Sequence, residues 1–411
     1  MQDSDIVHLK VLGRHICVLG SPRSIFELLD KRSSVTSDRE HSPVVRLCGQ
    51  DFQMSLMAYG ARTFSATIVK VAYGVDIAEK DDPYIALVEK AISAVVALTP
   101  GRYLLQYLPI LEYVPEWVPG AGFQRELAGW GAAAEHVKEL LFAKSLELLD
   151  SQVPDSPQSI VAQMAEKARK QDEPEPSRST PDLNLAETEM DIAKNIALGA
   201  FEAGADTTFS TLQAFFLAMS LYPDVQKKAQ AQLDAVVGTE RLPDHKDKDA
   251  LPYITAIVKE ALRWHVVLPF SIPHVTTEDM EYDGYFIPKG TILLGNSWVC
   301  LHDPETYPEP DRFNPERYLD VDGGSDPNAP DPGRFVFGYG RRTCPGRYFA
   351  NSSLFINIAS ILHTFDITPP LDEQGKPLVI EYQMTDTLTT SVRSIDLVLV
   401  VVLLPPSHFR N

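Results

Sequence analysis

The hydrophobic pattern changes several times along the first half of the chain. Residues 6–20 contain two short β-rich runs, IVHLKVL and HICVLG, which predict a hairpin. The apolar spacing becomes helical from Pro22 to Arg32, and it is mostly helical between Ala61 and Pro154. Residues 151–184 are polar and Pro-rich with few apolar positions, so we expect an exposed loop there.

The second half opens with a long helical segment. Glu189 to Leu221 is a run of 33 good helix formers that ends before Pro223, and at 1.5 Å per residue it would extend about 50 Å. Shorter helices are expected at 224–237 and 253–264, then strands within 281–295, and a last helix just after Cys344. We therefore expect a mainly α protein with small β-sheets, folded as a single domain over residues 1–411.

Composition and charge exclude several functions. The chain has 411 residues and a net charge of −19, which disfavours a nucleic-acid partner because phosphate binding needs a basic face. Its four cysteines form no Cys-x-x-Cys pair, and its ten histidines show no HExxH or HxxxH spacing, which argues against a zinc hydrolase. A reducing compartment is expected, where a lone thiolate serves as metal ligand or nucleophile.

One cysteine lies in a distinctive loop. Residues 337–346 read Phe-Gly-Tyr-Gly-Arg-Arg-Thr-Cys-Pro-Gly, with Cys344 just ahead of a predicted helix. Glycines allow the backbone to bend tightly under a flat cofactor, and helix amides favour a thiolate at that position. An isolated free cysteine is more often a small buried apolar residue, so the surrounding pattern decides the interpretation.

This loop resembles the cysteine loop of cytochromes P450, Phe-x-x-Gly-x-Arg-x-Cys-x-Gly, at every fixed position. The resemblance implies a P450 fold and haem b, with Cys344 as the iron ligand. It also implies that Arg342 pairs with a haem propionate, that Phe337 packs near the sulfur and that Gly346 belongs to the cofactor site. A thiolate on haem iron favours O–O cleavage.

The long helix carries a second pattern of the same family. Residues 203–208 read Ala-Gly-Ala-Asp-Thr-Thr, which resembles the oxygen-side motif of P450s. Gly204 allows close approach to the cofactor, and a mid-helix hydroxyl can bond back to a carbonyl and bend the helix. The resemblance implies that Thr207 hydrogen-bonds on the oxygen side and that Asp206 relays protons. Taken alone, the string is equally typical of a solvated helix face.

Two further sites follow from the resemblance. Glu260 and Arg263 share one helix face, which usually means a surface ion pair, but in the family they form a buried triad that Arg317 completes. This triad would stabilise the cysteine-side core and perform no chemistry. His274 either reaches a haem propionate or is a neutral structural histidine, and both interpretations stay open.

The chain departs from the family pattern at three junctions. After Tyr59-Gly60 the family has a helix with a Trp-x-x-x-Arg pattern that binds the propionates, whereas no tryptophan precedes Trp117 here. From its N-terminal residues we expect no membrane anchor of the family's type, and residues 391–411 form an atypical apolar tail. We therefore hypothesise an alternative or mis-joined gene product, which sequencing the transcript would test.

The expected activity is a monooxygenase that inserts one oxygen atom of O₂ into an apolar small molecule, such as a fungal secondary metabolite or a xenobiotic. NADPH would supply electrons through an NADPH-cytochrome reductase, and the protein would be a monomer. The family is expected at the endoplasmic reticulum, but a chain without the anchor would be cytoplasmic. The alternatives are a catalytically dead P450 remnant and, from another class, a cysteine hydrolase, which would need a histidine near Cys344.

Overall fold

The computed structural model divides the chain into two compact units. Unit 1 is Met1–Glu40 with Ser210–Asn411, and unit 2 is His41–Phe209. The structure describes residues 5–40, 43–47, 69–75, 102–151, 159–171, 183–369, 371–372, 374–378, 382, 384 and 400–403. Residues 41–209 cluster among themselves, while both chain ends belong to the other unit, and the single domain over residues 1–411 stays a prediction.

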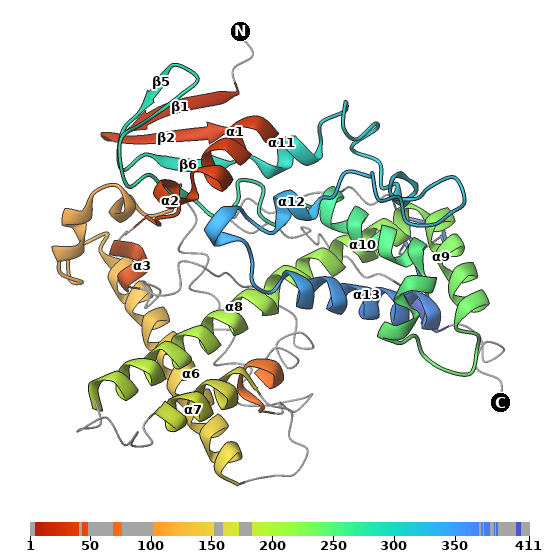
Figure 1. Ribbon diagram of the computed structural model, residues 1–411, viewed down its shortest axis with the longest axis horizontal. Helices are drawn as coiled ribbons and strands as arrows, with labels where there is room; N and C mark the ends of the chain where they lie inside the picture. Colours follow the sequence, from red (N-terminus) through yellow and green to blue (C-terminus); the bar gives the residue numbers. More distant parts are fainter. Residues whose placement is uncertain are drawn as a thin grey trace. The chain divides into compact units, whose positions relative to one another are not determined.

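A four-stranded sheet in unit 1 joins the N-terminal hairpin to strands from the second half of the chain (Figure 1). In spatial order its strands are β1 (Ile6–Val11), β2 (Arg14–Leu19), β6 (Ile292–Gly295) and β3 (His274–Val275). β1 and β2 pair antiparallel, which confirms the predicted hairpin, and Gly13 takes a φ of +87° in the turn. β2 runs parallel to β6, so this sheet places His274 near the N-terminal segment.

The helices of unit 1 largely follow the sequence pattern. α9 (Pro223–Val236) and α10 (Pro252–Trp264) each begin with proline, whose missing N–H is not needed in a first turn. α13 (Arg347–Thr364) starts just after Cys344, as expected. The other helical elements of unit 1 are short: α1 (Pro22–Ile25), η1 (Phe26–Lys31), α2 (Ser33–Thr36), η5 (His245–Ala250), α11 (Ser297–Leu301), η6 (Pro315–Tyr318), α12 (Gly333–Val336) and η7 (Gly340–Arg342).

Two small hairpins complete unit 1. β4 (Met280–Tyr282) and β5 (Tyr285–Ile287) pair antiparallel, as the strand-like pattern predicts. β7 (Phe365–Thr368) pairs antiparallel with β8 (Val400–Leu403). Part of the tail that the sequence marks as atypical is therefore a strand. Its apolar residues are the kind that favour one.

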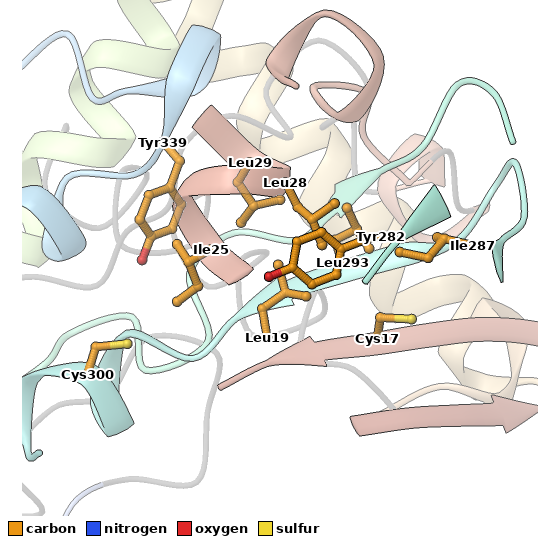
Figure 2. Close-up of a cluster of buried hydrophobic side chains, with 10 residues drawn as sticks. All are labelled: Cys17, Leu19, Ile25, Leu28, Leu29, Tyr282, Ile287, Leu293, Cys300 and Tyr339. Atoms are coloured by element: carbon orange, nitrogen blue, oxygen red, sulfur yellow. The ribbon is translucent and has the colours of Figure 1, made fainter. Parts of the chain in front are cut away.

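A buried apolar cluster ties the sheet of unit 1 to the cysteine loop (Figure 2). Its members are Cys17, Leu19, Ile25, Leu28, Leu29, Tyr282, Ile287, Leu293, Cys300 and Tyr339. Tyr339, from the loop, is 2% exposed, and its hydroxyl lies 2.7 Å from the Ser297 hydroxyl. A Cβ at Gly295 would lie only 3.0 Å from the Tyr339 ring, so β6 and the loop are in close contact. The loop is therefore anchored to the sheet by packing.

Unit 2 is built around one long helix, α6 (Gly122–Asp150). Its shorter elements are α3 (Pro43–Leu47), η3 (Leu104–Gln106), η4 (Pro109–Tyr113) and α7 (Ile160–Gln171). The prediction of a loop over residues 151–184 is wrong at α7. Val161 and Ala165 are four residues apart and fully buried, so they give this polar segment the apolar face that a packed helix needs.

α8 (Leu183–Leu221) is 39 residues long and begins six residues earlier than the sequence pattern indicates. Its buried side chains include Phe201 in unit 2 and Phe215 in unit 1, so the helix contributes to both cores. None of the described helices is long and apolar enough to cross a bilayer. The observed architecture is mainly helical with small sheets, which confirms the expected fold class.

Candidate functional site

The loop before Cys344 is held in a tight conformation. The Cys344 amide donates a 2.6 Å hydrogen bond to the Phe337 carbonyl, which closes the loop. Gly338 has a φ of +76°, and a Cβ there would lie 3.0 Å from a carbonyl of the same loop. Gly340 has a φ of +52°, and a Cβ there would lie 2.6 Å from the Leu29 carbonyl. These two glycines therefore cannot be replaced without moving the backbone.

The environment of Cys344 acts on its thiol in two directions. Burial raises the pKa of the Cys344 thiol, while the amides of Gly346 and Arg347 and the Arg347 charge oppose that rise. The expected stabilisation by helix-end amides is present, but burial outweighs it. A coordinating cation on the sulfur would be needed to keep the thiol deprotonated at neutral pH.

Three basic residues from separate segments of unit 1 converge; we call Arg39, His274 and Arg342 the basic cluster. Arg39 is 7% exposed, and its Nη1 donates to the carbonyls of Ile272 and Pro273 at 3.1 and 2.7 Å. The Arg39 Nε is buried and has no hydrogen-bond partner in the described part of the chain. Burial and the Arg342 charge lower the pKa of Arg39 to about 10.

His274 is the second member of the basic cluster. It is 2% exposed, and its Nδ1 donates to the Thr36 carbonyl at 2.7 Å. Burial, together with the charges of Arg39 and Arg342, lowers the pKa of His274 to about 4. At neutral pH the imidazole is therefore uncharged, and its Nε2 is an acceptor. This state matches the structural interpretation that the sequence leaves open.

Arg342 is the third member of the basic cluster. Its Nε donates to the Ser37 carbonyl at 2.8 Å, and the side chain is otherwise exposed. Arg342 thereby links the cysteine loop to the segment that carries Arg39. Because the charges of Arg39 and Arg342 repel one another, an anion placed beside them would relieve that repulsion.

The structure also brings Glu260, Arg263 and Arg317 together; we call this group the Glu260 triad. Arg263 donates from Nε and Nη2 to the two Glu260 carboxylate oxygens, at 2.8 and 2.9 Å, and both side chains are fully buried. Arg317 Nε and the Asn314 amide donate to Oε1 at 3.3 and 2.8 Å. Other guanidinium N–H groups donate to backbone carbonyls, such as that of Leu301 at the end of α11. This satisfied network is structural.

The predicted oxygen-side residues lie on α8 within unit 2. Thr207 Oγ1 donates to the Ala203 carbonyl at 2.9 Å, the back-bond expected of a hydroxyl in mid-helix. Gly204 lies within the same helical turn, while the side chain of Asp206 is outside the described residues. Cys344 belongs to unit 1, so each half of the predicted site is described within its own unit.

The residues of unit 1 fit haem. Among the described residues, no group of three or more His, Cys, Asp or Glu side chains could hold a metal ion. Haem brings its own nitrogens to the iron, so the chain would need to supply only the Cys344 thiolate. The orphaned Arg39 Nε and the unneutralised basic cluster suit the two carboxylates that haem carries.

Comparison with known proteins decides the family. The cytochrome P450 family model matches residues 53–391, most of the chain. This protein belongs to the cytochrome P450 family. Among its relatives, P450 monooxygenase COX2 of Coprinopsis cinerea is 41% identical, over 94% of this chain and 80% of the relative. COX1 of the same fungus is 35% identical over 94% of this chain and 83% of that relative. Tryptamine 4-monooxygenase of Psilocybe cyanescens is 35% identical over 93% of this chain and 82% of that relative. The chain is thus an oxidoreductase of the monooxygenase class.

These alignments contain a gap in this P450. The comparison with COX2 spans 435 positions, but 94% of 411 residues fills only about 386 of them. Roughly 50 positions of the alignment therefore have no residue here, and the comparison with tryptamine 4-monooxygenase leaves a similar number unfilled. The predicted loss of the Trp-x-x-x-Arg helix, near Gly60, would produce such a gap. Residues 48–68 lie outside the described part of this P450.

Arg39 is the site residue that sequence reasoning missed. It stands in Ser37-Asp38-Arg39-Glu40, a polar stretch without glycine or periodicity. Its partners are carbonyls more than 230 positions away in the sequence. The single available signal is a basic residue shortly after a predicted helix, which is too common to indicate a ligand.

Proposed function

We propose that this P450 is a haem-thiolate monooxygenase that inserts one oxygen atom of O₂ into an apolar small molecule, with electrons from NADPH through a separate reductase. The observation that carries the proposal is the pairing, within unit 1, of a single-cysteine loop with the unneutralised basic cluster. A thiolate donor and a carboxylate-binding site are the two protein contributions that haem requires.

The residues have separate roles in this proposal. Cys344 binds the iron, and Gly338 and Gly340 let its loop pass close to the cofactor. Arg39 and Arg342 hold the haem carboxylates by charge-assisted hydrogen bonds. When bound, haem supplies the activation of dioxygen. Thr207 and Asp206 would position and pass the protons that this activation consumes.

The relatives support the substrate class. The names of the three similar fungal proteins describe two P450 monooxygenases and one enzyme that acts on tryptamine, a small aromatic molecule. We infer for this chain a small, largely apolar substrate, such as a secondary metabolite or a xenobiotic. The arginines beside Cys344 would receive an acidic reductase, because complementary charge steers encounter between electron-transfer partners.

The test is the visible spectrum of the full chain expressed with haem, reduced with dithionite and exposed to carbon monoxide. We expect a red-shifted Soret band, which marks thiolate ligation, and its loss in Cys344→Ser. Cys300→Ala is the matched control, since burial raises the pKa of Cys300 to about 12 and its thiol is 3% exposed. A shifted band that survives in Cys344→Ser would overturn the ligand assignment.

A second candidate function follows from the alignment gap. A chain that lacks roughly 50 positions present in its relatives could be a haem-binding or haem-free remnant without turnover. The spectrum separates the two candidates in part, because a chain that purifies without haem cannot catalyse the monooxygenase reaction. A haem-loaded chain is then mixed with NADPH and a fungal reductase. Substrate-dependent NADPH oxidation with product formation supports the monooxygenase, and its absence across a panel of apolar substrates supports the remnant.

A further inference from the structure

Unit 1 contains a cavity of about 580 Å³ beside the cysteine loop. Phe337, Gly338 and Thr343 of that loop form one side of it. α10 supplies Val258 and Leu262 from the other side. Of the cavity's lining residues, the proposed reaction uses Phe337 and Gly338 at the haem and Arg347 in reductase docking, and it gives the rest of the space no role. Its volume lies in the range of sites that bind small molecules, about 300–1,000 Å³.

Four cations line this cavity: Lys248, Lys259, Arg334 and Arg347. Within the described ranges, none of the four lies within 4.0 Å of a carboxylate oxygen. They come from four separate elements, namely η5, α10, α12 and the start of α13. Such a gathering of unneutralised cations is unusual on a chain whose net charge is −19.

The two carboxylates in the lining have other partners. Asp30 Oδ1 accepts a hydrogen bond from the Gly340 amide at 3.0 Å. Asp331 Oδ1 accepts one from the Gly333 amide, also at 3.0 Å. Both carboxylates therefore accept hydrogen bonds from backbone amides of neighbouring loops. They leave the cations of the cavity without an ion pair.

Aromatic rings lie beside all four of these cations; the ring nearest Lys259, that of Tyr318 at 5.6 Å from the ammonium, is not part of the cavity lining. Arg334 is centred 4.6 Å from the Phe26 ring, and Arg347 is 4.6 Å from the Tyr348 ring. The Lys248 ammonium is 5.9 Å from the ring of Phe355, a buried residue of α13. These contacts direct the cations along apolar walls. The cavity thus offers positive charge next to flat apolar surface.

We propose that this cavity binds a small organic anion, a carboxylate or phosphate carried on an aromatic or apolar body. The cations would hold the anionic group, and the rings together with Val258 and Leu262 would contact the body. A concave site of this volume suits a free small molecule, whereas a protein partner needs a broad surface. The proposal does not depend on the monooxygenase reaction, because residues of the chain alone form the cavity.

Calorimetric titration of the full haem-supplied chain tests this site with 1-naphthyl phosphate as the probe. 1-Naphthol, which lacks the anion, and inorganic phosphate, which lacks the body, are the comparison ligands. We expect 1-naphthyl phosphate to bind at least 10-fold more tightly than either of them. Its affinity should also fall as salt concentration rises, since exposed charges are screened. Absence of binding at millimolar probe would overturn the proposal.

Matched double variants locate the binding. The double variant Lys248→Gln/Arg334→Gln should weaken the binding of 1-naphthyl phosphate by 10-fold or more. The control variant Lys246→Gln/Arg312→Gln removes the same amount of charge from two exposed residues that do not line the cavity; Lys246 lies on η5, as Lys248 does. This control should change the affinity for 1-naphthyl phosphate less than 2-fold. Equal affinities in both variants would place the probe elsewhere and refute the site. If reductase-supported NADPH oxidation falls in the first variant while probe affinity is unchanged, the cations serve partner docking and the proposal fails.

Discussion

Two groups of ionisable residues in unit 1, each with buried members, are organised in opposite ways. In the Glu260 triad, one carboxylate accepts from two guanidinium groups and a backbone amide, and loop carbonyls take the remaining N–H groups. In the basic cluster, Arg39 and His274 are also buried, but the Arg342 charge lowers the pKa of both, Asp38 offsets this only in part at Arg39, and the Arg39 Nε has no hydrogen-bond partner among the described residues. The triad is complete within the chain, and the cluster is not.

This difference separates structural charge from ligand-binding charge. A buried ion network whose groups are all paired gives a rigid junction and leaves no group for a ligand. A buried cation with an unpaired N–H lowers the stability of the chain alone. A bound anion that accepts a hydrogen bond from this N–H removes that destabilisation. The comparison predicts that substitutions in the triad will destabilise the protein without haem, whereas substitutions in the basic cluster will act mainly on haem binding.

Glu260→Gln should have the largest effect. The substitution keeps the side-chain shape but removes the negative charge between Arg263 and Arg317, so a fully buried cation loses its counterion. We expect the free energy of unfolding to fall by about 3–5 kcal/mol. Urea denaturation followed by circular dichroism measures this change. A loss below about 1 kcal/mol would show that the triad is not the junction described above.

Arg39→Gln should act on haem retention and not on the chain alone. Removing one charge-assisted donor from the carboxylate site is expected to raise the haem dissociation constant about 10- to 100-fold, since such a bond contributes about 1.5–3 kcal/mol. Transfer of haem to apomyoglobin measures the release. The free energy of unfolding without haem should change by less than about 1 kcal/mol, because the removed repulsion with Arg342 offsets the hydrogen bonds lost at the Ile272 and Pro273 carbonyls.

The control for this variant is Arg23→Gln. Arg23 is an exposed arginine of unit 1 that pairs with Asp283. It should leave haem release unchanged. Destabilisation of the haem-free chain by Arg39→Gln, with unaltered haem release, would assign Arg39 to the fold.

The comparison also shows what sequence can predict. Glu260 and Arg263 lie three residues apart on a strongly amphipathic helix, so local periodicity indicates that they share a face. Cys344, Gly338 and Gly340 lie within one loop whose spacing alone carries the signal. Such features depend on neighbours in the chain.

Features that depend on distant partners could not be predicted in the same way. Arg39 matters because Ile272 and Pro273 supply carbonyls to it and because Arg342 lies nearby. The helix at 160–171 is stabilised by burial of Val161 and Ala165, which the Pro-rich flanks obscure in the pattern. The division into two units reflects contacts that no local pattern records.

The charge state of His274 gives a pH test of the basic cluster. Its pKa is about 4 in the folded chain and about 6.5 when unfolded, so the unfolded chain binds more protons between these values. Stability from this group is therefore complete above pH 6.5 and is lost as pH falls toward 4, by about 1.4 kcal/mol per unit. Urea denaturation from pH 4 to 7 should show this slope, and His274→Asn should reduce it. An identical slope in the variant would assign the pH dependence to other groups.

The smallest effect is expected where the residue types and the spacing of Glu260 and Arg263 recur at the surface. Glu309 and Arg312 are the same residue types at the same spacing as Glu260 and Arg263, but their side chains are 71% and 56% exposed, with 3.6 Å between the charged atoms. Water already solvates both charges, so Glu309→Gln should lower the free energy of unfolding by less than about 1 kcal/mol. Measured beside Glu260→Gln under the same urea protocol, it separates the effect of burial from that of pairing. Equal losses of unfolding free energy in the two variants would mean that ion pairing alone, without burial, stabilises the triad. The contrast with the basic cluster would then no longer distinguish structural charges from ligand-binding charges.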